Sequence, residues 1–271
     1  MLTYEALIDN AKQRGMPHTK VRGILREYLQ VLILKEISRN KYGKKLFFTG
    51  GTYLRLVHGL KRFSEDLDYN TKTLSAIEFE NLLNTVINDL KKSGFKAELN
   101  YKHWGNIFCA NLVFPEVENI YNVVSKFSKQ KGITIKVETN RPKWKLESET
   151  QVVSGFGEFF PFICSEKGAL FADKIDAVSR KRRGRHIYDL MFMLSNEFPI
   201  NKNVLKVLGI KSNPLEYIVK SINNISQAEL NSMAESLRPF LFDEQEADMV
   251  EKAHVVIPLM IQKYIKNVQW R

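Results

Sequence analysis

Two aspartates, Asp66 and Asp68, stand two residues apart in a segment that the sequence predicts to be a strand. Alternate residues of a strand leave the same face, so both carboxylates point the same way. Two like charges held this close repel each other unless a cation or several hydrogen-bond donors compensate. Because oxygen-only ligands suit Mg²⁺ or Mn²⁺, the pair predicts a divalent metal site.

A glycine turn, Gly50-Gly51-Thr52, precedes the two aspartates and lets backbone N–H groups approach phosphate oxygens closely. The Thr52 hydroxyl adds one more donor. Glu138, on the polar face of a later predicted strand, could complete a set of three carboxylates. In nucleotidyl transfer, divalent ions held in this way clamp the attacking oxygen and the triphosphate. Each motif alone also has an ordinary explanation: the aspartates could be solvated strand residues, and the glycines could mark a tight turn. Because the two motifs occur on consecutive elements, we favour the functional explanation.

A lysine and an aspartate interrupt two apolar helix faces in the second half of the chain. Lys174 falls within the apolar stripe of a helix predicted over residues 165–182, and Asp189 lies inside an apolar segment, residues 187–194. A buried carboxylate is costly without a partner, which Lys174 or Arg185 could supply. Lys174 could equally snorkel to water or hold an anion, and a purely structural ion pair is a further alternative.

The segment Arg180-Lys181-Arg182-Arg183-Gly184-Arg185 lies between these two residues. It has two interpretations: a solvated helix end whose positive charge suits the helix dipole, or a surface that contacts phosphate or nucleic acid. The whole chain carries a formal net charge of +11 and has a pI near 9.5. This balance favours anionic partners without choosing among them.

Composition places the chain among folded globular proteins, with 44% hydrophobic and 26% charged residues over its length of 271. Its two cysteines, Cys109 and Cys164, predict neither a disulfide framework nor a cysteine-based metal site. The first residues lack the features of a signal peptide, and no apolar run reaches the roughly 20 residues of a membrane-spanning helix. A cytoplasmic protein is therefore expected.

Periodicity predicts an α+β fold in two parts, with a boundary near residue 160. Residues 1–160 are expected to form a mixed sheet with N-terminal helices, and residues 161–271 a helical domain. A capping box at Ser75 and Glu78 opens one helix, which ends near Gly94. The other expected helices cover residues 2–12, 21–38, 53–58, 165–182 and 187–194, with three or four more after Pro199; the expected strands cover residues 46–48, 66–69, 95–99, 107–114 and 133–139.

Three segments together resemble a known family. The run from Phe47 to Leu54 (FFTGGTYL), continued by the run from Arg62 to Asp68 (RFSEDLD), looks like the first motif of the AbiEii-type nucleotidyltransferases. That group includes the toxins of AbiE and MenAT-type toxin–antitoxin systems. Lys174-Ile175-Asp176-Ala177 through Arg180, and Arg185-His186-Ile187-Tyr188-Asp189-Leu190, are similar to its later motifs and follow in the same order.

The resemblance implies a polymerase-beta-like nucleotidyltransferase domain followed by a helical half that completes the active site. Asp66 and Asp68 would bind metal, Mg²⁺ or Mn²⁺. Lys174 would contact the nucleoside triphosphate, and Asp189 would act with it. Arg62 and Ser64 would support the metal strand and the phosphates. The chain departs from the family at His186, where an aspartate is usual, which leaves the role of this position open.

Toxic members of the family are thought to add nucleotides to RNA such as tRNA, restrained by a neighbouring antitoxin, and the name of the group refers to abortive infection. The resemblance therefore implies an NTP-dependent transferase that acts on RNA as a toxin. A second hypothesis keeps the chemistry and makes the acceptor a small molecule or a protein hydroxyl. A third makes the chain an inactive scaffold that binds a partner protein.

Overall fold

The computed structural model of the chain describes residues 1–105, 107–123 and 132–269. The chain divides into two compact units, the first made of Met1–Pro142 and Ser148–Ser165, the second of Lys143–Glu147 and Glu166–Arg271. The boundary expected near residue 160 falls inside a strand, β7 (Glu158–Ser165). Pro161 therefore does not end the sheet; it lies in the part of β7 that pairs with β6 (Ser148–Gly155).

A mixed sheet forms the centre of the first unit. Within the described residues it has seven strands in the order β3-β4-β5-β2-β1-β7-β6. Its parallel pairs are β1 with β7 and β2 with β5, and its other pairs are antiparallel. The remaining strands are β1 (Phe47–Thr49), β2 (Leu67–Asn70), β3 (Glu98–Tyr101), β4 (Phe108–Phe114) and β5 (Ile133–Asn140).

Alternating side chains explain how the central strands are held. In β5, Ile133, Ile135 and Val137 are fully buried, whereas the residues between them are half-buried. In β2, Leu67 and Tyr69 are buried in the same alternating way. The predicted strands here are confirmed, and the period of two leaves one face of each strand for polar side chains.

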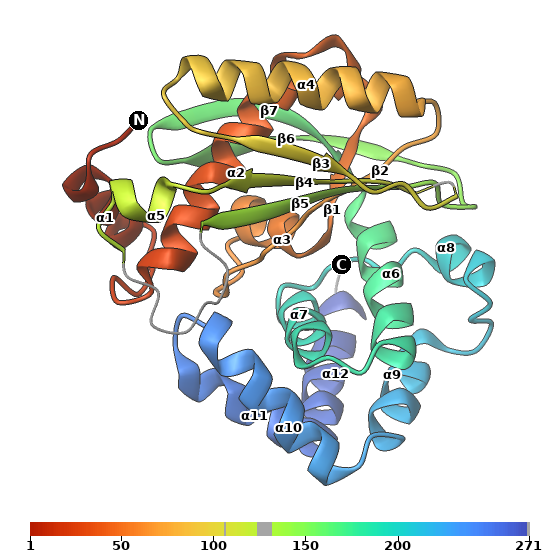
Figure 1. Cartoon of the computed structure of the whole chain (residues 1–271). Coiled ribbons are helices and arrows are strands. Elements are labelled where there is room, and N and C mark those ends of the chain that lie inside the picture. Colours follow the sequence, from red (N-terminus) through yellow and green to blue (C-terminus); the bar gives the residue numbers. More distant parts are fainter. Residues whose placement is uncertain (106, 124–131, 270–271) are drawn as a thin grey trace. The chain divides into compact units, whose positions relative to one another are not determined.

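Helices cover the sheet of the first unit (Figure 1). The predicted capping box is confirmed, since Ser75 and Glu78 close the first turn of α4 reciprocally. This helix packs against β3, β4 and α2, while α3 packs against β1, β2 and β6. The helices are α1 (Tyr4–Gln13), α2 (Val21–Arg39), the 3₁₀-helix η1 (Lys41–Lys45), α3 (Gly50–His58), α4 (Ala76–Lys92) and α5 (Val117–Ile120).

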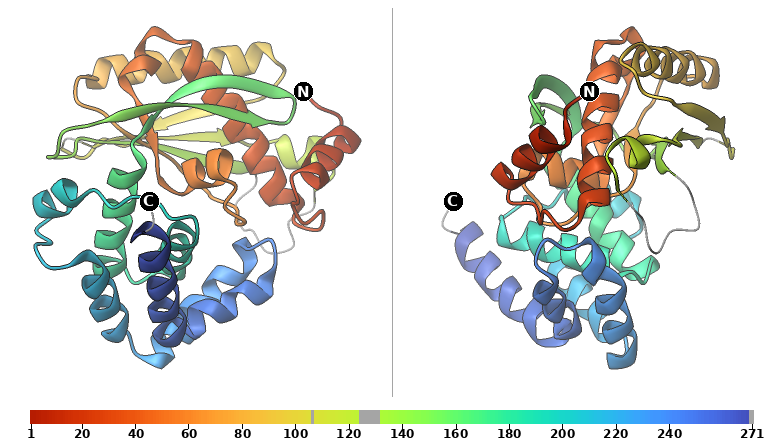
Figure 2. Two further views of the ribbon diagram at one scale, coloured as in Figure 1. Left: turned by 180° about the vertical axis from the view of Figure 1, so that it is seen from behind. Right: turned by 60° about the vertical axis from the view of Figure 1, so that its left-hand side comes forward.

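Strands β6 and β7 were not predicted. They form a long hairpin at one edge of the sheet, which Figure 2 shows from behind. Most side chains of β6 are exposed or half-buried and only Val153 is buried, because an edge strand contributes little to the core. The turn at Gly155 and Gly157 was the sequence signal for this hairpin.

The second unit is helical, as predicted. Five helices follow Pro199, one more than the upper expectation, because the α10–α12 region contains the additional short helix α11. The elements are α6 (Lys167–Arg180), α7 (Gly184–Ser195), α8 (Lys202–Val207), α9 (Pro214–Asn223), α10 (Gln227–Leu237), α11 (Ala247–Glu251) and α12 (Ala253–Gln269), with two 3₁₀-helices, η2 (Arg238–Phe240) and η3 (Glu244–Glu246). No helix in the described part of the chain is long and apolar enough to cross a membrane.

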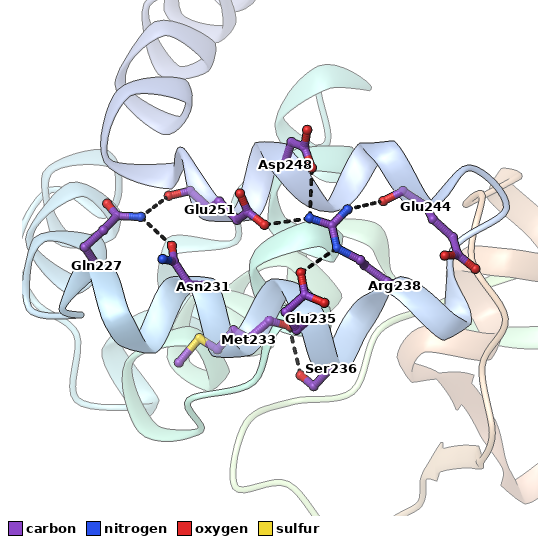
Figure 3. A network of polar contacts seen from close by, with 9 residues as sticks. All are labelled: Gln227, Asn231, Met233, Glu235, Ser236, Arg238, Glu244, Asp248 and Glu251. Atoms are coloured by element: carbon purple, nitrogen blue, oxygen red, sulfur yellow. Dashed lines mark hydrogen bonds and ion pairs between the residues drawn. The ribbon is translucent and has the colours of Figure 1, made fainter. Parts of the chain in front are cut away.

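Arg238 ties α10 to α11 in this unit (Figure 3). Its guanidinium donates to the carboxylates of Glu235 at 2.7 Å, Asp248 at 3.0 Å and Glu251 at 2.6 Å, and to the Glu244 carbonyl at 2.9 Å. Hydrogen bonds to Glu235 and Asp248 raise the pKa of Arg238 above its ordinary value. The Arg238 guanidinium thus holds α10, α11 and the segment between them together, because it binds three carboxylates and one carbonyl.

Candidate active site

The two aspartates lie at the start of β2, in the middle of the sheet. Asp66 comes directly before the strand and Asp68 is its second residue, and both are half-buried. Asp68 stands opposite Thr49 of β1 on one side and Glu138 of β5 on the other. Asp68 and Glu138 are therefore direct neighbours on adjacent strands, and both lie on the polar face of the sheet.

Lys136 lies between the carboxylates. Its Nζ is 3.7 Å from Asp66 Oδ2 and 3.0 Å from Glu138 Oε2. Partial burial lowers the pKa of Lys136, but Asp66, Glu138 and Asp68 outweigh this effect and raise its pKa above the ordinary value. The ammonium therefore stays charged and offsets part of the repulsion between the acids.

The part of Glu138 as the third carboxylate of a metal site stays a prediction. Among the described residues, no group of three or more His, Cys, Asp or Glu side chains is arranged to hold a metal ion. Glu138 instead faces the ammonium of Lys136, which lies between it and Asp66. Asp66 and Asp68 still fit a hard divalent cation, because both are oxygen donors, the Asp66 side chain is 28% exposed, and a cation already lies against it.

The predicted glycine turn forms the first turn of α3 rather than a loop before it. Gly50 has φ +80°, and a Cβ added there would lie 2.4 Å from Asp68 Oδ2. Only glycine therefore allows this backbone to pass so close to the carboxylate. The amino-terminal end of α3, where N–H groups have no partner within the helix, consequently begins beside Asp68.

The next residues of α3 contact the other predicted side chains. A Cβ on Gly51 would lie 2.5 Å from Arg62 Nη2 and 2.9 Å from Ser64 Oγ. The Thr52 hydroxyl donates to the Asp66 carbonyl. Arg62 is buried, and its Nη1 donates to the Phe63 carbonyl at 2.9 Å. Helix α3 thus brings together the seven sequence-predicted residues of this region, namely Gly50, Gly51, Thr52, Arg62, Ser64, Asp66 and Asp68.

In the second unit, Lys174 and Asp189 form an ion pair, with Nζ 2.9 Å from Oδ2. The side chains are 8% and 0% exposed, so the pair is sealed between α6 and α7. Of the two partners that the sequence allowed for Asp189, Lys174 is the one that forms this bond. Snorkelling of Lys174 to water is excluded by its burial.

His186 lies on α7, three residues before Asp189. It is 9% exposed, and neither ring nitrogen has a hydrogen-bond partner in the structure as described. Burial, followed by the charge of Lys174, lowers the pKa of His186 to about 3, although Asp189 acts in the opposite direction. The imidazole is therefore neutral at physiological pH.

The basic segment between the helices is partly engaged in internal contacts. Arg180, the last residue of α6, binds Asp176 at 2.7 Å and the Leu208 carbonyl at 3.3 Å. Arg182 binds Glu229 and, at 3.3 Å, the Asn224 carbonyl. Lys181 and Arg183 are exposed on the connection between α6 and α7. Some of these cations thus stabilise the fold and others face solvent, and contact of this segment with phosphate or nucleic acid stays a prediction.

Lys136 is the residue of this region that sequence reasoning missed. The alternation of β5 put Lys136 and Glu138 on one face, and this was the available signal. Its link to Asp66 depends on β5 lying beside β2 in a defined register, with Leu67 opposite Val137. Neither the strand order nor the register follows from periodicity alone.

A family model described as the nucleotidyl transferase AbiEii toxin of type IV toxin–antitoxin systems matches residues 32–255. A search of curated proteins finds no match.

Two solved structures are similar over nearly the whole chain. JHP933 from Helicobacter pylori superposes with a TM-score of 0.55 and 19% identity, over 92% of this chain and 95% of the other. MenT4, a nucleotidyltransferase toxin from Mycobacterium tuberculosis H37Rv, superposes with a TM-score of 0.58 and 17% identity, over 95% of this chain and 90% of the other. At these identities the likeness establishes a shared α+β fold.

Proposed function

Because the chain belongs to the AbiEii nucleotidyltransferase toxin family of type IV toxin–antitoxin systems, we propose that it moves a nucleoside monophosphate from an NTP to RNA in a metal-dependent reaction. The observation that carries the proposal is the Asp66–Asp68 pair at the amino-terminal end of α3. Paired carboxylates beside backbone donors are suited to holding a cation and phosphate oxygens side by side.

The proposed reaction is a displacement at the α-phosphorus of the NTP. An acceptor hydroxyl oxygen forms the new bond to the α-phosphorus, and the bond from that phosphorus to the bridging oxygen of the β-phosphate breaks. Pyrophosphate leaves with the electron pair, and the hydroxyl proton passes to water. Because negative charge grows on the transferred group and the leaving oxygen, catalysis depends on positioning and on positive charge.

The first unit would supply the metal-binding part. Asp66 and Asp68 would hold Mg²⁺ or Mn²⁺, which neutralises charge on the phosphates when bound. Gly50, Gly51 and Thr52 begin α3, whose amino-terminal N–H groups favour a phosphate there. Arg62 and Ser64 lie against Gly51, where they support this turn and add positive charge and a hydroxyl.

The second unit would supply a phosphate contact at Lys174. Asp189 holds the Lys174 ammonium in one orientation through a single bond at 2.9 Å. An ammonium has three N–H donors, so the pair leaves donors for a phosphate oxygen. Asp189 would therefore orient Lys174 rather than react itself.

The acceptor that we propose is RNA, with tRNA as the first candidate. The supporting observations are the net charge of +11, the exposed Lys181 and Arg183, and the fold shared with the toxin MenT4. Unpaired cations on a surface attract the phosphate backbone whatever its sequence. A cognate antitoxin, encoded nearby and acting in the cytoplasm, would restrain the enzyme and could connect it to abortive infection.

The test is transfer of label from an NTP to total RNA or total protein in the presence of Mg²⁺. With label on the α-phosphate, radioactivity is expected in RNA; with label on the γ-phosphate, it is expected in released pyrophosphate. Label in protein would support the second hypothesis, a protein hydroxyl acceptor. Absence of any transfer, together with no Mg²⁺-dependent NTP binding, would support the scaffold hypothesis and contradict ours.

A further inference from the structure

His186 is a buried imidazole whose two ring nitrogens both lack a hydrogen-bond partner in the described structure. His254 in the same unit, by contrast, has hydrogen-bond partners: its Nε2 lies 2.9 Å from the Ile225 carbonyl and 3.2 Å from the Ile222 carbonyl. Buried polar groups in folded proteins are nearly always hydrogen-bonded, because leaving one unpaired is costly. An unpaired imidazole therefore calls for a functional explanation.

The position of His186 indicates what that function is. His186 and Asp189 are three residues apart on α7, so their side chains share one face of the helix. Lys174 of α6 binds Asp189, and its positive charge is the strongest electrostatic influence on the imidazole. The unpaired ring thus lies beside the buried ion pair.

The protonation state limits what the ring can do. At neutral pH the imidazole carries no charge, and its pKa, lowered to about 3 by burial, makes it too weak a base to take a proton from an acceptor hydroxyl. One N–H donor and one acceptor nitrogen remain. Beside an ammonium, the group that the N–H can best satisfy is an anionic oxygen drawn there by Lys174.

We propose that His186 is a third nucleotide-binding residue of the second unit and donates its ring N–H to a phosphate oxygen of the NTP bound at Lys174. The inference rests on the proposed function of Lys174 as a triphosphate contact. A neutral donor adds a hydrogen bond without adding a second positive charge that would have to be buried next to Lys174.

The experiment compares His186→Leu with His254→Leu. Binding of a non-hydrolysable NTP analogue with Mg²⁺ is measured by calorimetry, and the melting temperature is measured on the same samples. His186→Leu is expected to weaken analogue binding about tenfold, the effect of one hydrogen bond to a charged group. Its melting temperature stays equal or rises, because an unpaired polar group has been replaced by an apolar one.

His254→Leu, the matched control, should behave in the opposite way. Its melting temperature falls because two carbonyls lose their partner, and its affinity for the analogue stays at the wild-type value. Equal analogue binding by His186→Leu and wild type would overturn the inference. A lower melting temperature with unchanged binding would overturn it also, since it would assign His186 to the fold.

A second measurement needs no substitution at His186. In wild-type protein with isotope-labelled imidazole nitrogens, adding the analogue with Mg²⁺ should shift the nitrogen resonances of one buried, neutral histidine. No shift would contradict the inference. The double variant Lys174→Met, Asp189→Leu, which leaves no buried charge without its partner, separates this inference from the proposed function. If it loses analogue binding while His186→Leu keeps it, only the role of His186 fails. If both bind normally, the role of Lys174 fails as well.

Discussion

The Asp66–Asp68 cluster and the Lys174–Asp189 pair hold charge in opposite ways. In the first, two half-buried carboxylates lie close together on the sheet, and Lys136 and the amino-terminal end of α3 offset their repulsion. The second joins the Lys174 ammonium to the Asp189 carboxylate, and the two side chains are 8% and 0% exposed. An ion pair at half-exposed acids contributes little to stability, whereas breaking a buried pair is strongly destabilising.

The difference predicts separate consequences for activity and stability. Substitutions at the half-exposed acids should abolish transfer with little effect on folding, because they relieve repulsion. A single substitution within the buried pair should destabilise the second unit, because one charge is left buried alone. The predictions below test this separation.

The largest expected effect is on transfer. Asp68→Asn should lower NTP-dependent label transfer by at least about a hundredfold, comparable to the loss of other groups that stabilise charge in a transition state. The free energy of unfolding in urea should change little. Asp9→Asn, at an exposed acid paired with Lys12 on α1, is the control and should keep wild-type transfer. A stable, fully active Asp68→Asn protein would remove Asp68 from the site.

The second effect is on stability. Asp189→Asn should lower the free energy of unfolding by about 3 kcal/mol, because it leaves the Lys174 ammonium buried without its partner. The double variant Lys174→Met, Asp189→Leu should recover most of this loss and remain inactive. As a control, Asp176→Asn breaks an ion pair with the largely exposed Arg180 and should cost less than about 1 kcal/mol. Equal losses at the two pairs would erase the distinction drawn between them.

The third effect concerns the turn beside Asp68. Gly50 and Gly59 share a φ of +80°, but a Cβ on Gly50 would meet Asp68, whereas nothing lies within 4 Å of one on Gly59. Gly59→Ala should therefore cost about 1 kcal/mol of backbone strain and leave transfer intact. Gly50→Ala should cost more and also lower transfer about tenfold or more, through displacement of the carboxylate. Identical behaviour of the two variants in unfolding and transfer assays would show that the close approach to Asp68 is unimportant.

The last effect is a pH dependence of stability, seen only below neutral pH. The imidazole of His186 titrates near 3 in the folded protein and near 6.5 when unfolded. Between these values the unfolded state binds a proton that the folded state does not, so stability falls as pH is lowered, by up to about 1.4 kcal/mol per pH unit. Above pH 6.5 this group contributes nothing. His186→Leu should flatten the unfolding free energy against pH in this window, and parallel profiles for the two proteins would contradict the assignment.

Local patterns were enough to predict many elements of the fold. Alternation in β5, the capping box of α4 and the apolar spacing of α2 each depend on neighbours in the sequence, and each prediction is confirmed. Strand β6 was missed because its side chains bury little and carry a weak pattern, whereas β7 buries Phe160, Phe162 and Cys164 but contains Pro161, at which the sheet was expected to end.

The site was predictable where one residue type was out of place in its pattern. Lys174 and Asp189 stood out as charges on apolar faces, and the structure pairs them. Lys136 did not stand out, because it lies on a polar face and only the register of β5 with β2 brings it to Asp66. The unpaired state of His186 depends on everything packed around it, which no local pattern contains.

Binding of Mn²⁺, followed by its electron paramagnetic resonance signal, tests the central claim most directly. Wild-type protein with an NTP analogue should bind the ion, and the Asp66→Asn, Asp68→Asn double variant should not. Glu138→Gln should weaken binding less than the double variant does, since the Glu138 carboxylate is also held by Lys136 at 3.0 Å. Undiminished Mn²⁺ binding by the folded double variant would contradict the assignment of Asp66 and Asp68 as the metal site.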